Sequence, residues 1–189
     1  MKLPEGAKIS KDYPFIKDLE KAVKNNVKIV LQYKNPEKEG DYKICPLKII
    51  FFDGFWYLLA QVDGKEWIIK FRLENIINIE LLGEYFTPPK NLSTFLDQSV
   101  NIWFTEKRDK QVVLKVDKEA ASYFKQQVYF PLQKITKENR DGSLRIETMI
   151  CHNEEILRII FRWIPYVHVV KPKELKIEVE AIVNGYLKK

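Results

Sequence analysis

The chain has 189 residues, of which 46% are hydrophobic and 13% aromatic, and it carries a formal net charge of +6. This composition supplies enough apolar side chains for packed cores and excludes wholesale disorder. No apolar run approaches the roughly 20 residues of a membrane-spanning helix, and the N-terminus lacks an apolar signal segment, so we expect a cytoplasmic protein without a membrane partner. The positive charge permits an anionic partner such as nucleic acid without requiring one.

The first half predicts one helix followed by a meander of strands. Residues 13–25 place apolar side chains at helical spacing, and VKIVLQY (27–33) alternates as a half-buried strand does. Three further strands are expected, at 42–52, 55–62 and 65–72. Asp-Gly pairs separate them, and Asp-Gly between apolar runs is a strong hairpin signal. With the short apolar segment IINIELL (76–82), these strands predict a small β-barrel.

The second half begins where Pro88-Pro89 prevents a strand or helix from continuing. We therefore divide the chain into a linker and helix, a barrel and a C-terminal domain, at 1–26, 27–86 and 87–189. The later strands are expected at 111–116, 128–136, 143–151 and 166–170, and the helices at 117–126, 153–164 and 172–187. Asp117 and Asn153 are the candidate N-caps. The order β-α-β-β-α-β is that of a ferredoxin-like unit, which makes the fold class α+β.

Counting outward from the two Asp-Gly turns assigns the hairpin side chains to two faces. One face is apolar and contains Trp56 and Leu58, so it is the expected core face. The other face combines aromatic and basic residues, namely Lys48, Phe55, Tyr57, Lys70 and Arg72, with Tyr57 opposite Lys70 and Phe55 opposite Arg72. Basic groups attract phosphates and aromatic rings stack on bases, which suits an anion-binding surface. A solvated sheet face with cross-strand cation–aromatic pairs would explain the same pattern.

Residues for catalysis or metal binding are sparse. His152 and His168 are isolated, without a second ligand at metal spacing. Cys45 and Cys151 lie in apolar stretches and are expected to be reduced core thiols. The sequence contains no P-loop, no G-x-S-x-G elbow and no dinucleotide-binding glycine pattern. We therefore expect neither an enzyme nor a bound cofactor or metal.

A small basic edge is predicted on the helix at 153–164, where Arg158 and Arg162 lie four residues apart. It is a possible second anion-binding surface. An ordinary i,i+4 ion pair between Glu154 and Arg158 is the other explanation.

Several segments of the first half resemble the WYL domain, which is named for the tripeptide found here as Trp56-Tyr57-Leu58. VKIVLQY, Pro46 before an apolar strand and FRLENI (71–76) agree with the family in order and spacing. Residues 91–189 resemble the WCX extension that often follows a WYL domain, through VHVVKPKEL (167–175) and the trailing helix to Tyr186.

The resemblance implies a small Sm-like (SH3-like) β-barrel, followed by a ferredoxin-like extension, in a bacterial transcriptional regulator that is often a homodimer. In relatives the WYL domain senses an effector, such as single-stranded DNA or another nucleic acid or nucleotide, on a basic surface. The predicted ligand-binding residues are Tyr57, Lys70, Arg72, Lys43, Lys48 and Phe55.

The match at these positions is incomplete. Arg72 corresponds to a family arginine, but Asn75 and Lys43 replace residues that are usually arginine. Asparagine is uncharged, and lysine lacks the bidentate fork of arginine. Both departures therefore weaken the expected anion site.

Family members usually carry a winged helix-turn-helix ahead of the WYL domain, and none fits in the first 26 residues. We expect this chain to be a fragment of a longer regulator that contacts duplex DNA through that missing module. The alternative is a protein that acts without a DNA-binding domain of its own. Two other functions remain open. One is a protein-interaction and dimerisation module, and the other is an enzyme acting on nucleotides.

Overall fold

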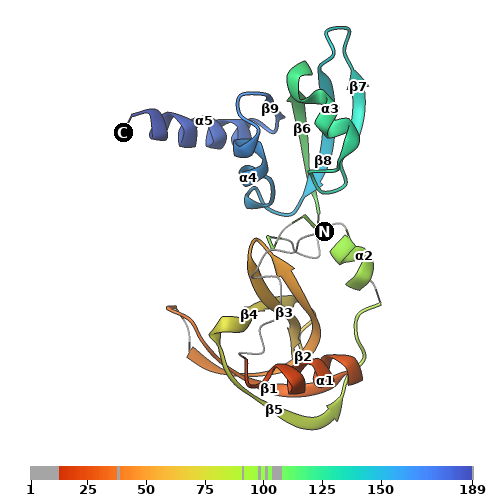
Figure 1. Cartoon of the computed structure of the whole chain (residues 1–189), viewed down its shortest axis with the longest axis vertical. Helices are drawn as coiled ribbons and strands as arrows, with labels where there is room; N and C mark the ends of the chain where they lie inside the picture. Colours follow the sequence, from red (N-terminus) through yellow and green to blue (C-terminus); the bar gives the residue numbers. More distant parts are fainter. Residues whose placement is uncertain are drawn as a thin grey trace. The chain divides into compact units, whose positions relative to one another are not determined.

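The expected helix and strands of the first half form an antiparallel sheet with one helix packed on it (Figure 1). The elements are α1 (Ile16–Asn25), β1 (Val27–Lys34), β2 (Glu39–Phe52), β3 (Phe55–Val62), β4 (Ile68–Arg72) and β5 (Ile76–Tyr85). A 3₁₀ turn, Leu73–Asn75, joins β4 to β5, and the strand order is β4-β3-β2-β1-β5. The computed structural model describes residues 13–37, 39–90, 92–97, 99–100, 102–103 and 108–188.

The core of this sheet follows the predicted alternation. Asn26 ends α1 in the left-handed conformation, which asparagine tolerates better than most residues. The helix then contributes Leu19 and Ala22 to a core that they share with the inward-facing strand residues. The most buried of these strand residues are Ile29, Leu31, Ile44, Leu58 and Ala60, and Leu73 of the 3₁₀ turn joins them in the core.

The register of the two hairpins agrees with the sequence in one case and differs in the other. Phe51 pairs with Trp56 across β2 and β3, as expected. Across β3 and β4, however, Leu58 pairs with Phe71 and not with Ile69. The last pair of this ladder is Gln61 with Ile68, so the connection is longer than the two-residue turn assumed from Asp63-Gly64. A shift of two residues preserves the side-chain faces, and the division into core and outer face is unchanged.

The chain divides into two compact units, Met1–Thr94 and Phe95–Lys189, with the short helix α2 (Leu92–Asp97) at the division. The second unit has a four-stranded antiparallel sheet of order β7-β8-β6-β9. Its elements are β6 (Lys110–Val116), α3 (Lys118–Gln126), β7 (Lys134–Glu138), β8 (Leu144–Ile150), α4 (Glu154–Arg162), β9 (Val167–Lys171) and α5 (Lys173–Leu187). The predicted β-α-β-β-α-β order is therefore present.

One expected strand of the second unit is shorter than predicted. Residues 128–136 were expected to be extended, but β7 begins only at Lys134. The side chain of Gln133 explains the difference, because its Oε1 accepts hydrogen bonds from the backbone N–H groups of Tyr129 and Phe130, at 3.1 and 3.2 Å. Its Nε2 donates to the carbonyl of Phe124 at 3.1 Å. The Gln133 amide thus supplies hydrogen bonds to backbone groups that would otherwise need partners in a strand ladder.

Both predicted N-cap residues stand at the N-cap position, but neither side chain caps its helix. The Asp117 carboxylate contacts His168 Nε2 at 2.8 Å and Lys115 Nζ at 2.9 Å. Asn153 donates from Nδ2 to the Glu178 carboxylate on α5 at 2.6 Å. These side chains connect elements of the tertiary structure.

Candidate nucleic-acid interface

Side chains of β2, β3 and β4 form the predicted aromatic and basic surface, which we call the β2–β4 face (Lys48, Phe55, Tyr57, Lys70 and Arg72). Tyr57 lies between Ile50 and Arg72 in the register, and not beside Lys70 as the assumed turn implied. Lys48 and Lys70 both pair with Leu59. Because residues two apart on a strand share a face, the register brings these side chains to one surface.

Arg72 and Phe55 make the closest contact on this face. The guanidinium carbon Cζ of Arg72 lies 3.6 Å from the centre of the Phe55 ring, a cation–π arrangement. Both side chains remain accessible, because Phe55 is 40% exposed and the Arg72 side chain 34% exposed. The contact holds a flat cation on the surface with an aromatic ring beneath it.

Glu74 also contacts Arg72. Its Oε1 lies 2.6 Å from Arg72 Nη2. Glu74 was not among the residues predicted from sequence, although an acid two residues after a candidate ligand-binding arginine is a signal that could have indicated this contact. The guanidinium is therefore partly neutralised by its own chain.

Tyr33 contacts the chain both before and after Glu74, once through a backbone group and once through a side chain. Its hydroxyl accepts hydrogen bonds from the backbone N–H of Arg72 at 3.3 Å and from Nδ2 of Asn75 at 3.2 Å. Asn75 stands where the family resemblance suggested a second basic residue. In this chain the position instead fixes the 3₁₀ turn that follows β4.

Lys43, the remaining predicted ligand-binding residue of the first unit, lies in a separate charge cluster with Lys28, Asp63 and Glu84. Lys43 Nζ lies 2.9 Å from Glu84 Oε2, and Lys28 Nζ lies 2.8 Å from Asp63 Oδ1. The hydrogen bond to Glu84 is the main reason that the pKa of Lys43 is raised, and the bond to Lys28 lowers the pKa of Asp63. Lys43 is roughly 16 Å from Lys48 along β2, so it is not brought next to Arg72.

Arg158 and Arg162 belong to the second unit, on the exposed side of α4. The buried side of the same helix includes Ile156 and Ile160. The structure thus assigns these arginines to a different unit from the β2–β4 face.

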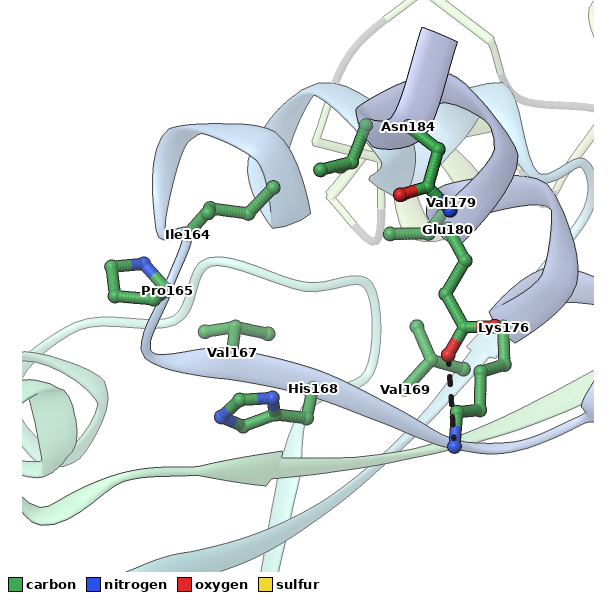
Figure 2. A pocket seen from close by; sticks show the side chains of 10 residues that line it. Ile164, Pro165, Val167, His168, Val169, Lys176, Val179, Glu180 and Asn184 are labelled. Atoms are coloured by element: carbon green, nitrogen blue, oxygen red, sulfur yellow. Dashed lines mark ion pairs between the residues drawn. The ribbon is translucent and has the colours of Figure 1, made fainter. Parts of the chain in front are cut away.

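The second unit also contains an open apolar cavity of about 410 Å³. Figure 2 shows that three segments bound it, namely the segment that follows α4, strand β9 and helix α5. Its lining is formed by Ile164, Pro165, Val167, His168, Val169, Lys176, Val179, Glu180, Val183 and Asn184. At its edge Lys176 Nζ lies 3.8 Å from Glu180 Oε1. His168, one of the lining residues, forms a hydrogen bond with Asp117, and this bond is the main cause of the lowered pKa of Asp117.

Within the described parts of the chain, no three His, Cys, Asp or Glu side chains are grouped as a metal site would need. Cys45 and Cys151 are buried thiols, which confirms the expectation for both. Among the same residues, no helix combines the length and apolar character that a membrane crossing needs.

Comparison with models of known protein families identifies the two domains of the chain. The WYL domain model matches residues 14–81, and the WCX domain model matches residues 108–187. The chain carries a WYL domain followed by a WCX domain. The resemblance inferred from sequence is therefore confirmed. The β2–β4 face belongs to the WYL domain, and the apolar cavity belongs to the WCX domain.

Solved structures similar to this chain have distant sequences. Proteasome accessory factor B/C (PafBC) of Arthrobacter aurescens matches with 18% identity and a TM-score of 0.42, over 97% of this chain and 27% of that one. A CRISPR Cas-related protein matches with 9% identity and a TM-score of 0.61, over 91% of this chain and 50% of that one. The WYL–WCX chain thus spans half or less of the length of these proteins. A search of curated proteins finds no match.

Proposed function

We propose that the WYL and WCX domains form the effector-sensing region of a transcriptional regulator, and that the β2–β4 face binds a single-stranded nucleic acid or a nucleotide. The observation that carries this proposal is the Arg72 guanidinium stacked on Phe55, with Tyr57 paired beside it in the register. Phosphates are attracted to guanidinium and ammonium groups, and bases stack on exposed aromatic rings. Lys48 and Lys70 add two further cations to the same face.

In this proposal the WYL domain is an Sm-like barrel and the WCX domain a ferredoxin-like unit. The strand orders β4-β3-β2-β1-β5 and β7-β8-β6-β9 support these assignments. The ligand acts on an attached DNA-binding domain, which alone contacts duplex DNA. Such control requires that the ligand bind one of two conformational states more tightly than the other.

The affinity of the wild-type chain and of Arg72→Ala for a fluorescent single-stranded oligonucleotide tests this proposal. Removal of the guanidinium takes away a charge-assisted phosphate contact and leaves Phe55 without its cationic partner. We expect the variant to bind about tenfold more weakly, or weaker still, at low salt.

A homodimerisation module is the second candidate, because α5 exposes many apolar side chains. Ile177, Ile182, Tyr186 and Leu187 are 53%, 47%, 81% and 73% exposed, whereas Leu175 is fully buried. Figure 1 shows α5 extending beyond the sheet of its own unit. This candidate predicts a dimer that dissociates in Tyr186→Ala when measured by sedimentation. Loss of the dimer in Tyr57→Ala instead would place the interface on the β2–β4 face.

A further inference from the structure

The Arg72 cation of the β2–β4 face already has an anionic partner from its own chain. Arg72 Nη2 lies 2.6 Å from Glu74 Oε1, and the flat side of the guanidinium is covered by Phe55. Arg72 Nε is buried and makes no hydrogen bond to the described residues. A phosphate that approaches Arg72 therefore meets a guanidinium whose outer edge is shared with a carboxylate.

The carboxylate is carried by a turn that the fold fixes at both ends. Glu74 lies in the 3₁₀ turn between β4 and β5. The Tyr33 hydroxyl accepts hydrogen bonds from the backbone N–H of Arg72, just before the turn, and from the side-chain amide of Asn75, its last residue. Because the turn is held, the carboxylate stays near the guanidinium without a large further loss of conformational freedom.

We propose that Glu74 is an internal competitor for Arg72, which an anionic ligand must displace in order to bind. The inference rests on the proposed function, since it assumes that Arg72 is a ligand contact. Glu74 and Arg72 are both solvent-accessible, with side chains 47% and 34% exposed, and ion pairs of this kind are weak enough to exchange with a ligand.

The competition selects among anions. A ligand with a single weak charge gains no more from Arg72 than Glu74 already supplies. A phosphate can form two parallel hydrogen bonds with the guanidinium, and a chain of phosphates can also contact Lys48 and Lys70. Glu74 is therefore a specificity-determining residue that favours oligonucleotides over simple anions.

The test measures the affinity of a fluorescent single-stranded oligonucleotide at low salt for wild type, Glu74→Gln and Glu20→Gln. Glu20 is an exposed acid on α1, so its variant has the same change of net charge. We expect Glu74→Gln to bind about three- to tenfold tighter and Glu20→Gln to stay within about twofold of wild type. The gain should vanish when Arg72→Ala is added, because the carboxylate acts through Arg72.

Three other results of this measurement are possible, and each would overturn a specific claim. If wild type binds through Arg72 but Glu74→Gln has the same affinity, the competitor role is wrong and the proposed function stands. A gain that persists in the absence of Arg72 also overturns it, because the effect is then general repulsion. If neither wild type nor Glu74→Gln binds, the ligand site itself is wrong, and the competitor role falls with it.

Discussion

The tripeptide Trp56-Tyr57-Leu58 shows how one residue differs in role from its neighbour. Leu58 is fully buried in the core, and Trp56 packs on Phe51 with ring centres 5.1 Å apart. Tyr57 points to the opposite face, where it pairs with Arg72. Strand alternation predicted this division, and it survived a two-residue error in register because the side-chain period is also two. The Glu74 contact was not predicted, because it depends on the exact path of the turn.

At the same scale, the charge cluster predicts how stability depends on pH. Hydrogen bonds to lysines lower the pKa of Asp63 and of Glu84, so the stability they contribute is present above the ordinary carboxylate pKa and is lost as pH falls through the lowered values. The raised pKa of Lys28 and of Lys43 has the opposite sign: that stability is lost as pH rises through the raised values. The cluster therefore stabilises the WYL domain between about pH 5 and pH 10.

Urea unfolding of wild type and Asp63→Asn across this range checks the prediction. The variant should be less stable at neutral pH, and the difference should shrink below about pH 4, where the carboxylates become protonated. Asp41→Asn, an exposed change on β2, is the matched control and should show no such dependence. A difference between wild type and Asp63→Asn that is independent of pH would contradict the account.

At the scale of elements, the least predictable contact is the buried ion pair that joins Arg108 to α4. Glu155 is fully buried, and Arg108 Nη1 lies 2.7 Å from its Oε1. The second carboxylate oxygen of Glu155 accepts the backbone N–H of Cys151 at 3.0 Å. In the sequence, Glu154 and Glu155 stand at the start of a helix, where negative charge is favourable in itself. Nothing in helical spacing indicated that one of these acids would be buried with a partner 47 residues away.

Arg108→Met should therefore destabilise the WCX domain strongly, because it leaves the Glu155 carboxylate buried without its cation. We expect a loss of about 3–5 kcal/mol in the free energy of unfolding, measured by urea denaturation followed by circular dichroism. Arg140→Met, in the exposed turn before β8, should change the free energy of unfolding by less than about 0.5 kcal/mol. Equal effects of the two changes would show that the ion pair contributes nothing specific.

At the scale of the whole molecule, the order of elements was more predictable than their contacts. Apolar periodicity and Asp-Gly turns indicated the meander of the WYL domain and the β-α-β-β-α-β order of the WCX domain. These signals are local in sequence. The shortened strand at β7 and the caps that bond elsewhere depend on Gln133, Asp117 and Asn153, whose partners are set by the tertiary structure. Residue types indicated that the β2–β4 face combines aromatic and basic side chains. They did not indicate that Glu74 neutralises part of its charge.

The most direct test of the central claim is the salt dependence of oligonucleotide binding, measured by fluorescence anisotropy. Wild type, Arg72→Ala and Lys24→Ala are titrated at two salt concentrations, Lys24 being an exposed lysine on α1. If the β2–β4 face binds phosphates, affinity falls as salt rises, Arg72→Ala binds more weakly with a smaller salt dependence, and Lys24→Ala behaves as wild type. Absence of binding at low salt, or binding that is the same in all three proteins, would contradict the assignment of this face.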